Sequence, residues 1–424
     1  MKIKSGSIRT GFLASVLFFS LITGFIPQSF GQSRNDYIKV SSGVQYQLIG
    51  TYDTQKLNDV FRKDLENFLL TSKVGSKAYN DSFPAATYPV KLYRVQYNSV
   101  IPELSNRPVV ASGLIAIPEN GSDSMPLLMY QHGTTFSRTE APSFPENSME
   151  TKIMVSRFAS QGYIVVCADY FGKGTSDLPD SYLVLNSTQQ ACVDMLFAAK
   201  SILTAKKIKP VSLFLAGWSQ GGWATLVFLQ KLESLGINVT AAATASAPAD
   251  GLVMYDRWFN NYQPIDAVYL PGCITLQIQA QEYYHQQTGL TALAIRPEYL
   301  QASIDFYNSK IDWTTFRKLT KDKLQDYLKP EFLASGNTCE SPYWQVLEKS
   351  QAYRWRSHTP MYNYYGGSDE VVPVVIAKLP ETFHKVLGCG PTTAVYAGDK
   401  ADHRATFIYS VIHEKSWFDQ FLKK

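Results

Sequence analysis

The chain has 424 residues, of which 45% are hydrophobic and 18% are charged. Such a composition is typical of a folded globular protein and excludes a disordered, fibrous or repetitive one, and the length can bury one large core or two modest ones. The formal net charge is only +4 at neutral pH, so electrostatics gives no argument for binding to nucleic acid.

The first 31 residues have the pattern of a secretory signal peptide. Three cations precede an apolar run over residues 11–26, and small residues lead up to Gly31. The run is shorter than the ~20 residues that a spanning helix needs, and serines interrupt it. We therefore expect cleavage near Gly31 or Gln32 and a secreted or periplasmic mature protein; an uncleaved membrane anchor is the alternative. Loss of the three cations lowers the formal charge to +1.

Five cysteines follow the predicted cleavage point, and their odd number leaves at least one unpaired. Cys167 lies in an apolar strand-like run and Cys192 in a helix-like run, so both are expected to be buried thiols. Cys273, Cys339 and Cys389 could supply one disulfide in an oxidising compartment. No cysteine spacing resembles a zinc or iron–sulfur site, and we expect no metal or organic cofactor.

The mature chain begins with a segment, residues 32–89, that is expected to wrap the body of the protein. Apolar side chains recur at helical spacing over residues 54–70, which predicts a helix packed on that body. Three strand-like runs follow, over residues 90–97, 108–118 and 126–133. A short polar break separates the second run from the third, which is typical of a hairpin connection.

Helix-like and strand-like runs then alternate. Helices are predicted over residues 149–161 and 188–206, and strands over 163–170, 211–216 and 239–247. Strands that alternate with helices build a mostly parallel sheet with helices on both faces, and the early hairpin-linked strands would form its antiparallel edge. This is the arrangement of an α/β-hydrolase fold, and we assign residues 90–249 to the first part of its core.

The alternation is interrupted over residues 250–357, where four of the seven tryptophans lie. Helices are predicted there over residues 275–287, 297–309 and 321–328. An insertion at this point would lie above the carboxyl ends of the strands, so we interpret it as a large helical cap, or lid, placed before the acid-bearing strand. Most of its aromatic side chains are expected to be ordinary packing, with a minority lining a pocket.

The core resumes over residues 358–424. A strand is predicted at residues 360–365 and another at 392–396, with a helix near 374–386 between them. A closing helix over residues 406–422 completes the chain.

A Gly-x-Ser-x-Gly pattern, Gly217 to Gly221, joins the strand-like run at residues 211–216 to a helix-like run. This context predicts a nucleophile elbow, in which the small flanking residues allow a sharp turn and Ser219 projects above the sheet. The N-terminus of the next helix would stabilise an oxyanion through its free N–H groups and its dipole. An ordinary glycine-rich turn is the alternative.

A serine nucleophile needs a base, and the base needs an acid to orient it. Of the six histidines, His403 alone follows the last predicted strand in a polar loop, where this fold places its base. Asp369 follows the strand at residues 360–365, and the order Ser219, Asp369, His403 is the order expected of the fold. A turn aspartate that merely caps the next helix is the alternative interpretation of Asp369. The rival acids are Glu370, Asp399 and Asp250.

Two backbone N–H groups are expected to bind the oxyanion. One belongs to Gln220, the residue after the serine. The other should come from the loop after the third strand, where we choose Thr134, with Gly133 as the alternative. The neighbouring His132 is expected to support this loop rather than to carry a proton.

The glycines Gly172 and Gly174 follow the predicted strand at residues 163–170. They could be mistaken for a phosphate-binding loop, but the spacing of that motif is absent. A tight turn that supports the site is the better interpretation.

These motifs together resemble the secretory lipase family of α/β-hydrolases, which is known from fungi and has bacterial relatives. The resemblance extends from about residue 90 to the C-terminus and implies hydrolysis of carboxylic esters, with the acyl chain bound under the cap. As partners we expect a small-molecule or lipid ester substrate, with transient contact between the cap and a lipid interface. Fungal members carry a Gly-Tyr-Ser-Gly-Gly elbow, whereas Trp218 and Gln220 stand here. The residues that carry the resemblance are Tyr130-Gln131-His132-Gly133-Thr134, Ala168-Asp169-Tyr170-Phe171-Gly172-Lys173-Gly174, Gly217-Trp218-Ser219-Gln220-Gly221-Gly222, Gly367-Ser368-Asp369 and Asp402-His403.

The sequence therefore predicts a secreted serine ester hydrolase that acts on lipid-like or other apolar esters. A peptidase of the prolyl-oligopeptidase type shares the fold and the triad, but the chain is too short for the usual propeller beside a hydrolase core. A catalytically silent binding protein on this fold would typically lack a member of the triad. An esterase for aromatic or acetylated plant-polymer esters would also suit an aromatic cap.

Overall fold

The computed structural model describes residues 36–79, 82–335, 341–388 and 390–423. The predicted signal peptide, residues 1–31, lies outside these ranges, as do Cys339 and Cys389. The chain from Asp36 to Lys424 forms one compact unit. Within the described part, Cys167, Cys192 and Cys273 are free and buried, which confirms the first two predictions and leaves Cys273 out of any disulfide.

In the described residues, ten strands form one mixed sheet in the order β1-β2-β3-β4-β6-β5-β7-β8-β9-β10. Neighbours from β1 to β4 pair antiparallel, β4 pairs antiparallel with β6, and all later pairs are parallel. The strands are β1 (Ile38–Ser41), β2 (Val44–Tyr52), β3 (Val90–Ile101), β4 (Arg107–Pro118), β5 (Ser124–Gln131), β6 (Ile164–Ala168), β7 (Lys209–Trp218), β8 (Ala241–Ala245), β9 (Met361–Tyr365) and β10 (Thr392–Tyr396).

The predicted hairpin between β4 and β5 is wrong. The two strands are consecutive in the sequence, but β6 lies between them and pairs with both, antiparallel with β4 and parallel with β5. A short polar break indicates only that the chain reverses direction. It does not indicate which strands pair in the sheet, because that depends on where the later strand β6 inserts. The hairpin in this region joins β3 and β4 instead.

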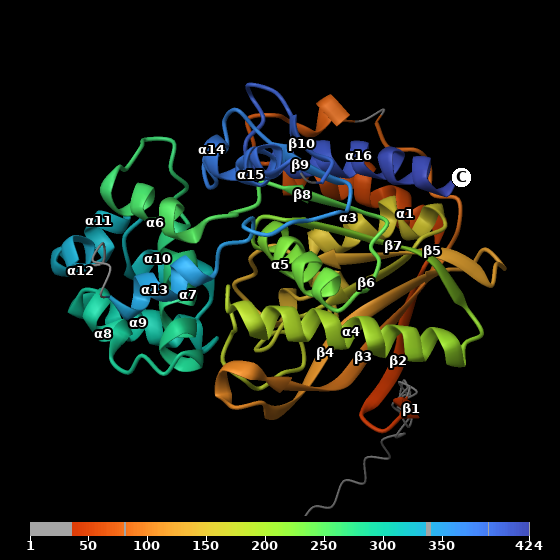
Figure 1. The fold of residues 1–424 in the computed structure, drawn as a ribbon, viewed down its shortest axis with the longest axis horizontal. Helices are drawn as coiled ribbons and strands as arrows, with labels where there is room; N and C mark the ends of the chain where they lie inside the picture. Colours follow the sequence, from red (N-terminus) through yellow and green to blue (C-terminus); the bar gives the residue numbers. More distant parts are fainter. Residues whose placement is uncertain (1–35, 80–81, 336–340, 389, 424) are drawn as a thin grey trace, which may run out of the picture. The chain divides into compact units, whose positions relative to one another are not determined.

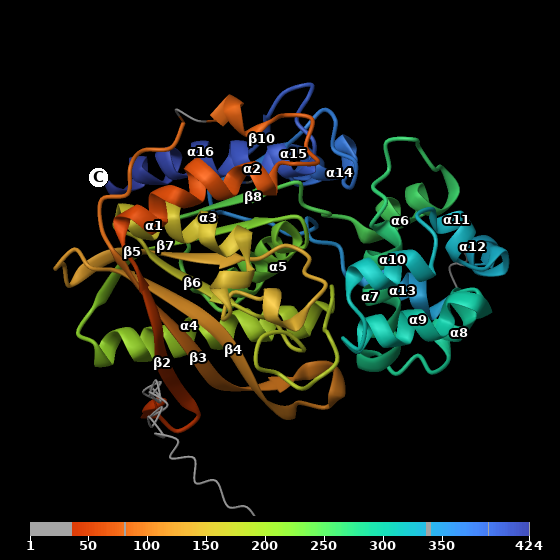
Figure 2. The ribbon, with the colours of Figure 1, turned by 180° about the vertical axis from the view of Figure 1, so that it is seen from behind.

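Helices cover both faces of the sheet (Figures 1 and 2). On one face lie α4 (Leu185–Ala205) and α5 (Gln220–Ser234), with α5 packed on β7 and β8. On the other face lie four further helices, and α16 packs on β8 and β9 there. The predicted helix at residues 54–70 is α1, a π-helical turn and α2 in succession. The four helices are α1 (Thr54–Asp59), α2 (Leu65–Phe68), α3 (Met149–Arg157) and α16 (His403–Leu422).

The sheet separates two hydrophobic cores. Successive residues of the central strands point alternately to the two faces, so Met129 of β5 belongs to the core beside α4 and α5, while Leu128 and Tyr130 belong to the core beside α3 and α16. Because both faces are covered, the parallel strands are apolar at nearly every position, as expected for such sheets. This explains why they were visible in the sequence as continuous apolar runs.

Between β8 and β9 the chain forms a set of helices, here called the helical insertion (residues 251–349). In Figures 1 and 2 it lies beside one end of the sheet, and its buried side chains join the core that contains α4 and α5. Two further helices lie between β9 and β10 and are not part of the insertion: α14 (Val374–Ala377) and α15 (Leu379–Leu387). The helices of the insertion are α6 (Gly251–Asn260), α7 (Leu270–Tyr284), α8 (Leu290–Ala294), α9 (Pro297–Tyr307), α10 (Trp313–Leu319), α11 (Leu324–Tyr327), α12 (Pro330–Ser335) and α13 (Pro342–Lys349).

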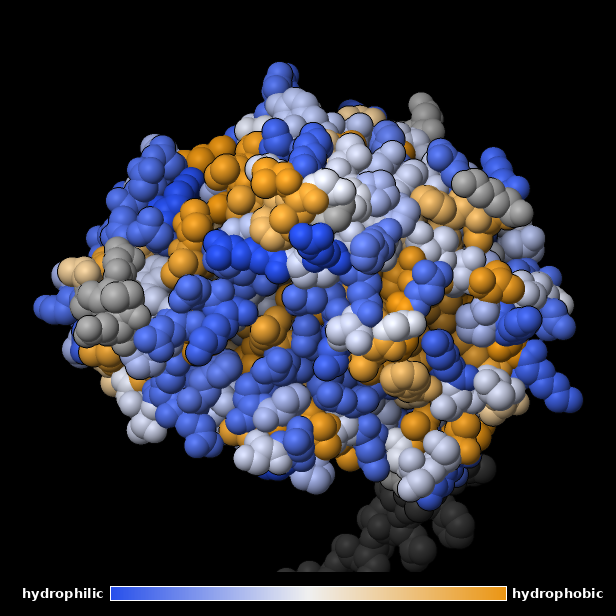
Figure 3. Space-filling model, in the orientation of Figure 1, coloured by the Kyte–Doolittle hydropathy of each residue, from blue (hydrophilic) through white to orange (hydrophobic). Residues whose placement is uncertain are grey.

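Hydrophobic surface gathers around α6 and α14 in Figure 3. Exposed apolar side chains of these helices and of the segment after α6 include Val253, Val268 and Val375, each with more than 40% of its surface accessible. None of the helices in the described ranges combines the length and the apolar character that crossing a membrane requires.

Candidate active site

Ser219 occupies a strained turn between β7 and α5. Its backbone has φ +58° and ψ −123°, and a non-glycine residue held in such a region costs of order 1–3 kcal/mol. The N–H of Ser219 donates to Ala245 O of β8 at 2.9 Å, so the adjacent strand holds the turn. The strand, the sharp turn and the helix predicted around Ser219 are all present; its role as nucleophile stays a prediction.

The two glycines of the elbow are required by close backbone approach. A Cβ added to Gly217 would lie 2.2 Å from Gly221 O, and one added to Gly221 would lie 1.9 Å from Gln131 O at the end of β5. Neither position can hold a larger residue without moving backbone. The elbow is therefore locked against both its own helix and the neighbouring strand.

His403 and Asp369 form a buried pair. The Nδ1 atom of His403 lies 3.0 Å from Asp369 Oδ1 and 3.1 Å from Oδ2. The same carboxylate accepts the N–H groups of Val371 at 2.9 Å and Val372 at 2.8 Å. Asp369 thus contacts the imidazole and also holds its own turn, but it does not cap the next helix, because α14 begins after Pro373 without a side-chain cap. Its role as the catalytic acid stays a prediction.

The sequence suggested that His403 lies in a polar loop. In the structure it is instead the first residue of α16. The side chain of Asp402 accepts the N–H of Ala405 at 3.0 Å and caps the helix. The helix therefore begins three residues earlier than the predicted start at residue 406. A helix terminus holds the imidazole more firmly than a loop would.

The charges around the imidazole determine its proton affinity. Burial would lower the pKa of His403, but the nearby charge of Asp369 and the hydrogen bond to it, with Glu370 and Asp402, raise that pKa above 6.5. Burial would likewise raise the pKa of Asp369, and His403 overcomes this so that the pKa falls below 3.8. The pair is therefore built to stabilise an imidazolium next to a carboxylate.

Two residues beside the Asp369–His403 pair hold the backbone of His403. Trp218 donates its indole N–H to His403 O at 3.1 Å, and its ring centroid lies 5.0 Å from the imidazole. Glu370 accepts the N–H of His403 at 3.0 Å. Glu370, proposed above as a rival acid, thus accepts a hydrogen bond from the backbone of His403 and not from its imidazole ring.

The remaining candidates are engaged elsewhere. Asp250 caps α6 and accepts the hydroxyl of Tyr353 at 3.1 Å, and Asp399 accepts the hydroxyl of Tyr396. His132 is buried against Tyr170, with Nδ1 2.7 Å from Gly133 O and Nε2 3.2 Å from Asp169 O. Burial lowers the pKa of His132 to about 4, so the ring is neutral and supports the loop as expected.

The two residues whose N–H groups are predicted to bind an oxyanion line the same cavity as Ser219. Gln220 is the first residue of α5, and the first N–H groups of a helix have no partner within it. Thr134 follows β5 and lines the cavity with Gln220. The alternative donor, Gly133 N–H, instead donates to Glu150 Oε1 at 2.8 Å. Thr134 is therefore the better choice of the two.

Glu150 is a buried carboxyl that the sequence did not reveal. It lies on α3, accepts Gly133 N–H and also accepts the hydroxyl of Tyr130. Burial raises its pKa to about 7, although both hydrogen bonds and the charge of His403 oppose the shift. Glu150 thus fixes the backbone one residue before Thr134.

The cavity that contains Ser219 and His403 has a volume of about 290 Å³. Aromatic side chains from the core and the insertion form part of its wall, including Trp258 and Trp313 of the four tryptophans counted in the predicted cap. A larger cavity of about 870 Å³ lies between residues 103–107 and the insertion, away from these residues. In the ranges that the structure describes, no three His, Cys, Asp or Glu side chains gather as a metal site would require.

Comparison with solved structures places this architecture among known proteins. A protein of Legionella pneumophila matches with a TM-score of 0.76 and 22% identity, over 91% of this chain and 98% of its own. The rice cell wall degrading esterase LipA of Xanthomonas oryzae matches with 0.74 and 21%, over 92% and 99%. Candida antarctica lipase A in its closed state matches with 0.64 and 14%, over 89% and 82%.

No protein-family model matches the sequence, and no curated protein matches it in a sequence comparison. The structural neighbours and the sheet topology together confirm the predicted α/β-hydrolase fold. The chain also resembles the structures of a lipase and an esterase, as the motifs suggested. At such low identity this likeness concerns the fold.

Proposed function

We propose that this chain is a serine hydrolase of carboxylic esters. The observation that carries the proposal is the convergence of three groups in one place. Ser219 stands at a strained strand-to-helix turn, and it lines the same cavity as His403, whose Nδ1 is bonded to Asp369. Nucleophile, base and orienting acid in this arrangement are the requirements of acyl transfer through a covalent intermediate.

In the proposed reaction, Ser219 Oγ attacks the ester carbonyl and His403 takes its proton. Because Nδ1 faces Asp369, the proton is accepted at Nε2. The oxyanion of the tetrahedral intermediate is bound by the N–H groups of Gln220 and Thr134. The alcohol leaves with the proton from His403, and water activated by the same imidazole then releases the acid. Asp369 stabilises the imidazolium at each step.

The test is hydrolysis of p-nitrophenyl esters from acetate to palmitate by wild type and by Ser219→Ala. We expect activity in the wild type and its loss in the variant. Ser201→Ala is a matched control, because the Ser201 hydroxyl lies on α4 and donates only to Phe197 O. Failure of the wild type to hydrolyse any ester, or equal activity of Ser219→Ala, would refute the proposal. Cleavage of a prolyl amide alone would favour a peptidase, and binding without turnover a silent binding protein.

Esters with an aromatic acyl group are a second candidate substrate class. Trp258, Trp313 and Tyr255 line the cavity around Ser219, and aromatic walls favour flat aromatic groups by stacking. A structural neighbour of this chain is an esterase that degrades the rice cell wall, and we propose plant-polymer esters as substrates to test. Methyl ferulate hydrolysed faster than p-nitrophenyl butyrate would support this class, and Trp313→Ala should then reduce the ferulate rate selectively.

The insertion is proposed to act as a cap that also touches lipid surfaces. The predicted cap limits, residues 250–357, which extend beyond the helical insertion at both ends, and the export of the mature chain are part of this proposal. Exposed apolar side chains such as Val253, Ile265 and Val268 support contact with an interface. Flotation of the protein with phosphatidylcholine vesicles tests the contact, and N-terminal sequencing of the exported protein tests cleavage near Gly31. Val253→Ser with Val268→Ser should reduce flotation.

A further inference from the structure

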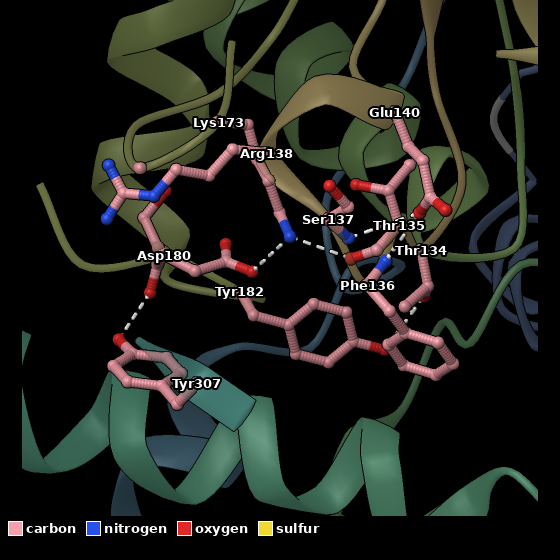
Figure 4. Close-up of polar contacts among 12 residues, drawn as sticks. Thr134, Thr135, Phe136, Ser137, Arg138, Glu140, Lys173, Asp180, Tyr182 and Tyr307 are labelled. Carbon is pink, nitrogen blue, oxygen red and sulfur yellow. Dashed lines mark hydrogen bonds and ion pairs between the residues drawn. The ribbon is translucent and has the colours of Figure 1, made fainter. Parts of the chain in front are cut away.

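The loop that carries Thr134 is held by a segment distant in the sequence. We call residues 133–140 the oxyanion loop and residues 172–182, which follow β6, the brace. Lys173 of the brace donates its Nζ to Thr135 O at 2.7 Å, and the hydroxyl of Tyr182 lies 3.0 Å from Thr134 Oγ1. Figure 4 shows both side chains directed at the oxyanion loop. The brace thus contacts Thr134, whose N–H is proposed to bind the oxyanion, and the next residue, Thr135.

A third contact joins the far end of the oxyanion loop to the brace. Arg138 donates Nη1 to Ser176 O and Nη2 to Leu178 O, the latter at 2.8 Å. In return, Gly174 N–H donates to Arg138 O at 3.0 Å. The two segments are therefore bonded at several points rather than at one.

Lys173 is held in place by a buried ion pair. Its Nζ lies 3.0 Å from Asp180 Oδ2, and both side chains are almost completely buried. Two charges removed from water in this way add little net stability, but they fix geometry because neither can move without losing its partner. The pair thereby fixes the Nζ that holds Thr135 O.

The other side of the brace is bonded to the helical insertion. The hydroxyl of Tyr307 on α9 donates to Asp180 O at 2.7 Å, as Figure 4 shows. The hydroxyl of Tyr284 on α7 donates to Pro179 O at 2.8 Å. Two helices of the insertion therefore reach the same two residues of the brace, next to the ion pair.

The insertion also contacts the oxyanion loop directly. The ring of Phe136 stacks on Trp313 at 4.8 Å and packs against Phe306 at 5.4 Å. A Cβ added to Gly272 of α7 would lie 3.0 Å from Phe136 Cζ, so α7 lies close behind this ring. The loop is consequently clamped between the brace and the insertion.

We propose that the brace couples the position of the helical insertion to the oxyanion hole. Lys173 and Tyr182 are positioning residues that set the Thr134 N–H, and the hydroxyls of Tyr284 and Tyr307 transmit the placement of the insertion to them. This inference rests on the proposed function. Removal of one of these hydrogen bonds lets the oxyanion loop relax. The Thr134 N–H then reaches the tetrahedral oxyanion poorly, while ground-state binding of the ester is little changed.

The experiment compares Tyr182→Phe, Lys173→Met and the double variant Tyr284→Phe/Tyr307→Phe with wild type. Tyr327→Phe is the matched control, because this buried hydroxyl bonds to Thr275 and Ser303 inside the insertion at 2.6 and 2.5 Å. For each protein, kcat and KM for p-nitrophenyl butyrate and the affinity for an alkyl trifluoromethyl ketone are measured. The ketone forms a tetrahedral adduct with the serine and so reports the oxyanion hole. Thermal unfolding verifies that each variant is folded.

Loss of one oxyanion donor typically costs about 10²–10³ in kcat. We therefore expect a fall in kcat of about tenfold for Tyr182→Phe and for the double tyrosine variant, and about a hundredfold for Lys173→Met. Ketone affinity should fall in parallel, KM should stay within about threefold, and Tyr327→Phe should match wild type. If Lys173→Met does not fold, the inference is tested by Tyr182→Phe and by the double variant Tyr284→Phe/Tyr307→Phe.

Unchanged kcat and ketone affinity in folded Tyr182→Phe and in the double variant would overturn the inference. An equal loss in Tyr327→Phe would also overturn it, since any loosening of the insertion would then have the same effect. These results are distinct from failure of the proposed function. In that case the wild type itself hydrolyses no ester and does not react with a fluorophosphonate at Ser219.

Discussion

The elbow around Ser219 and the oxyanion loop border the same cavity but are held in different ways. The elbow is fixed by its own backbone, through the positive φ of Ser219 and the contacts that only glycine permits at Gly217 and Gly221. The oxyanion loop is fixed by side chains from α3, the brace and the insertion. A single substitution within the elbow should therefore cause a large loss. The oxyanion loop should instead be weakened in smaller steps, by substitutions in the distant segments that support it.

A change at Asp369, the acid that orients the base His403, sets the scale for both regions, because Asp369 belongs neither to the elbow nor to the oxyanion loop. Asp369→Asn should lower kcat by about 10⁴. The imidazole must be neutral to act, so wild-type activity is lost as the pH falls through the raised pKa of His403. Removing the Asp369 charge lowers that pKa and moves the acid limb of kcat/KM to lower pH. A pH profile of both proteins measures the shift, and an unmoved limb would contradict the assignment of the pair.

The elbow should fail at once when its close contacts are blocked. Gly221→Ala places a Cβ 1.9 Å from Gln131 O, and the backbone shift should cost more than about 3 kcal/mol of unfolding free energy. Gly50→Ala is the control, since an added Cβ there meets no atom within 4 Å. Urea unfolding measures both. A stable Gly221→Ala would mean that the elbow is not locked by its backbone.

The oxyanion loop should weaken in steps when one of its supports is removed. Glu150→Leu leaves Gly133 N–H and the Tyr130 hydroxyl without their acceptor, at a cost of about 1–3 kcal/mol in stability. Because Thr134 is the next residue, kcat should also fall by about ten- to a hundredfold. Glu150→Gln keeps an acceptor oxygen and should stay close to wild type. Equal losses in the two variants would indicate that the charge, not the hydrogen bond, matters.

The smallest effect is expected where the elbow reaches His403. Trp218→Phe keeps an aromatic ring but loses the indole N–H that donates to His403 O at 3.1 Å. A single hydrogen bond contributes about 1 kcal/mol, so kcat should fall by less than about tenfold while KM is unchanged. Trp417→Phe, whose ring stacks on Tyr362 far along α16, is the control. A hundredfold loss would show that the elbow is not as self-contained as its backbone suggests.

The parts of the structure that the sequence predicted correctly are those with local signals. The central strands are continuous apolar runs, and the elbow is a pattern of consecutive residues at Gly217 to Gly221. Asp369 and His403 were found because the order of elements in this fold limits where an acid and a base can lie. Each of these predictions needs only neighbours along the chain or a known order.

The parts that were missed depend on contacts between distant residues. The β4–β5 hairpin was wrong because β6, more than thirty residues later, inserts between them. Glu150 has no signal in the sequence, and Glu370 was considered only as a rival acid. The tertiary fold alone shows that their carboxylates accept the N–H groups of Gly133 and His403. The contact between Lys173 and Thr135 likewise joins segments that are distant in the sequence. Trp218 was noted as a departure from the family elbow, but its bond to His403 spans 185 positions.

The division of the interior into two cores has a consequence for how such a molecule can diversify. Side chains of the insertion belong to the core beside α4 and α5, whereas Phe407, Ile408 and Val411 of α16 belong to the other one. Among the described residues, that second core contains no member from the insertion. A graft that exchanges the insertion for one from another protein would thus need to be matched to one layer only. The layer that anchors the helix bearing His403 could be inherited unchanged, so the insertion could be replaced without rebuilding the packing that holds the proposed base.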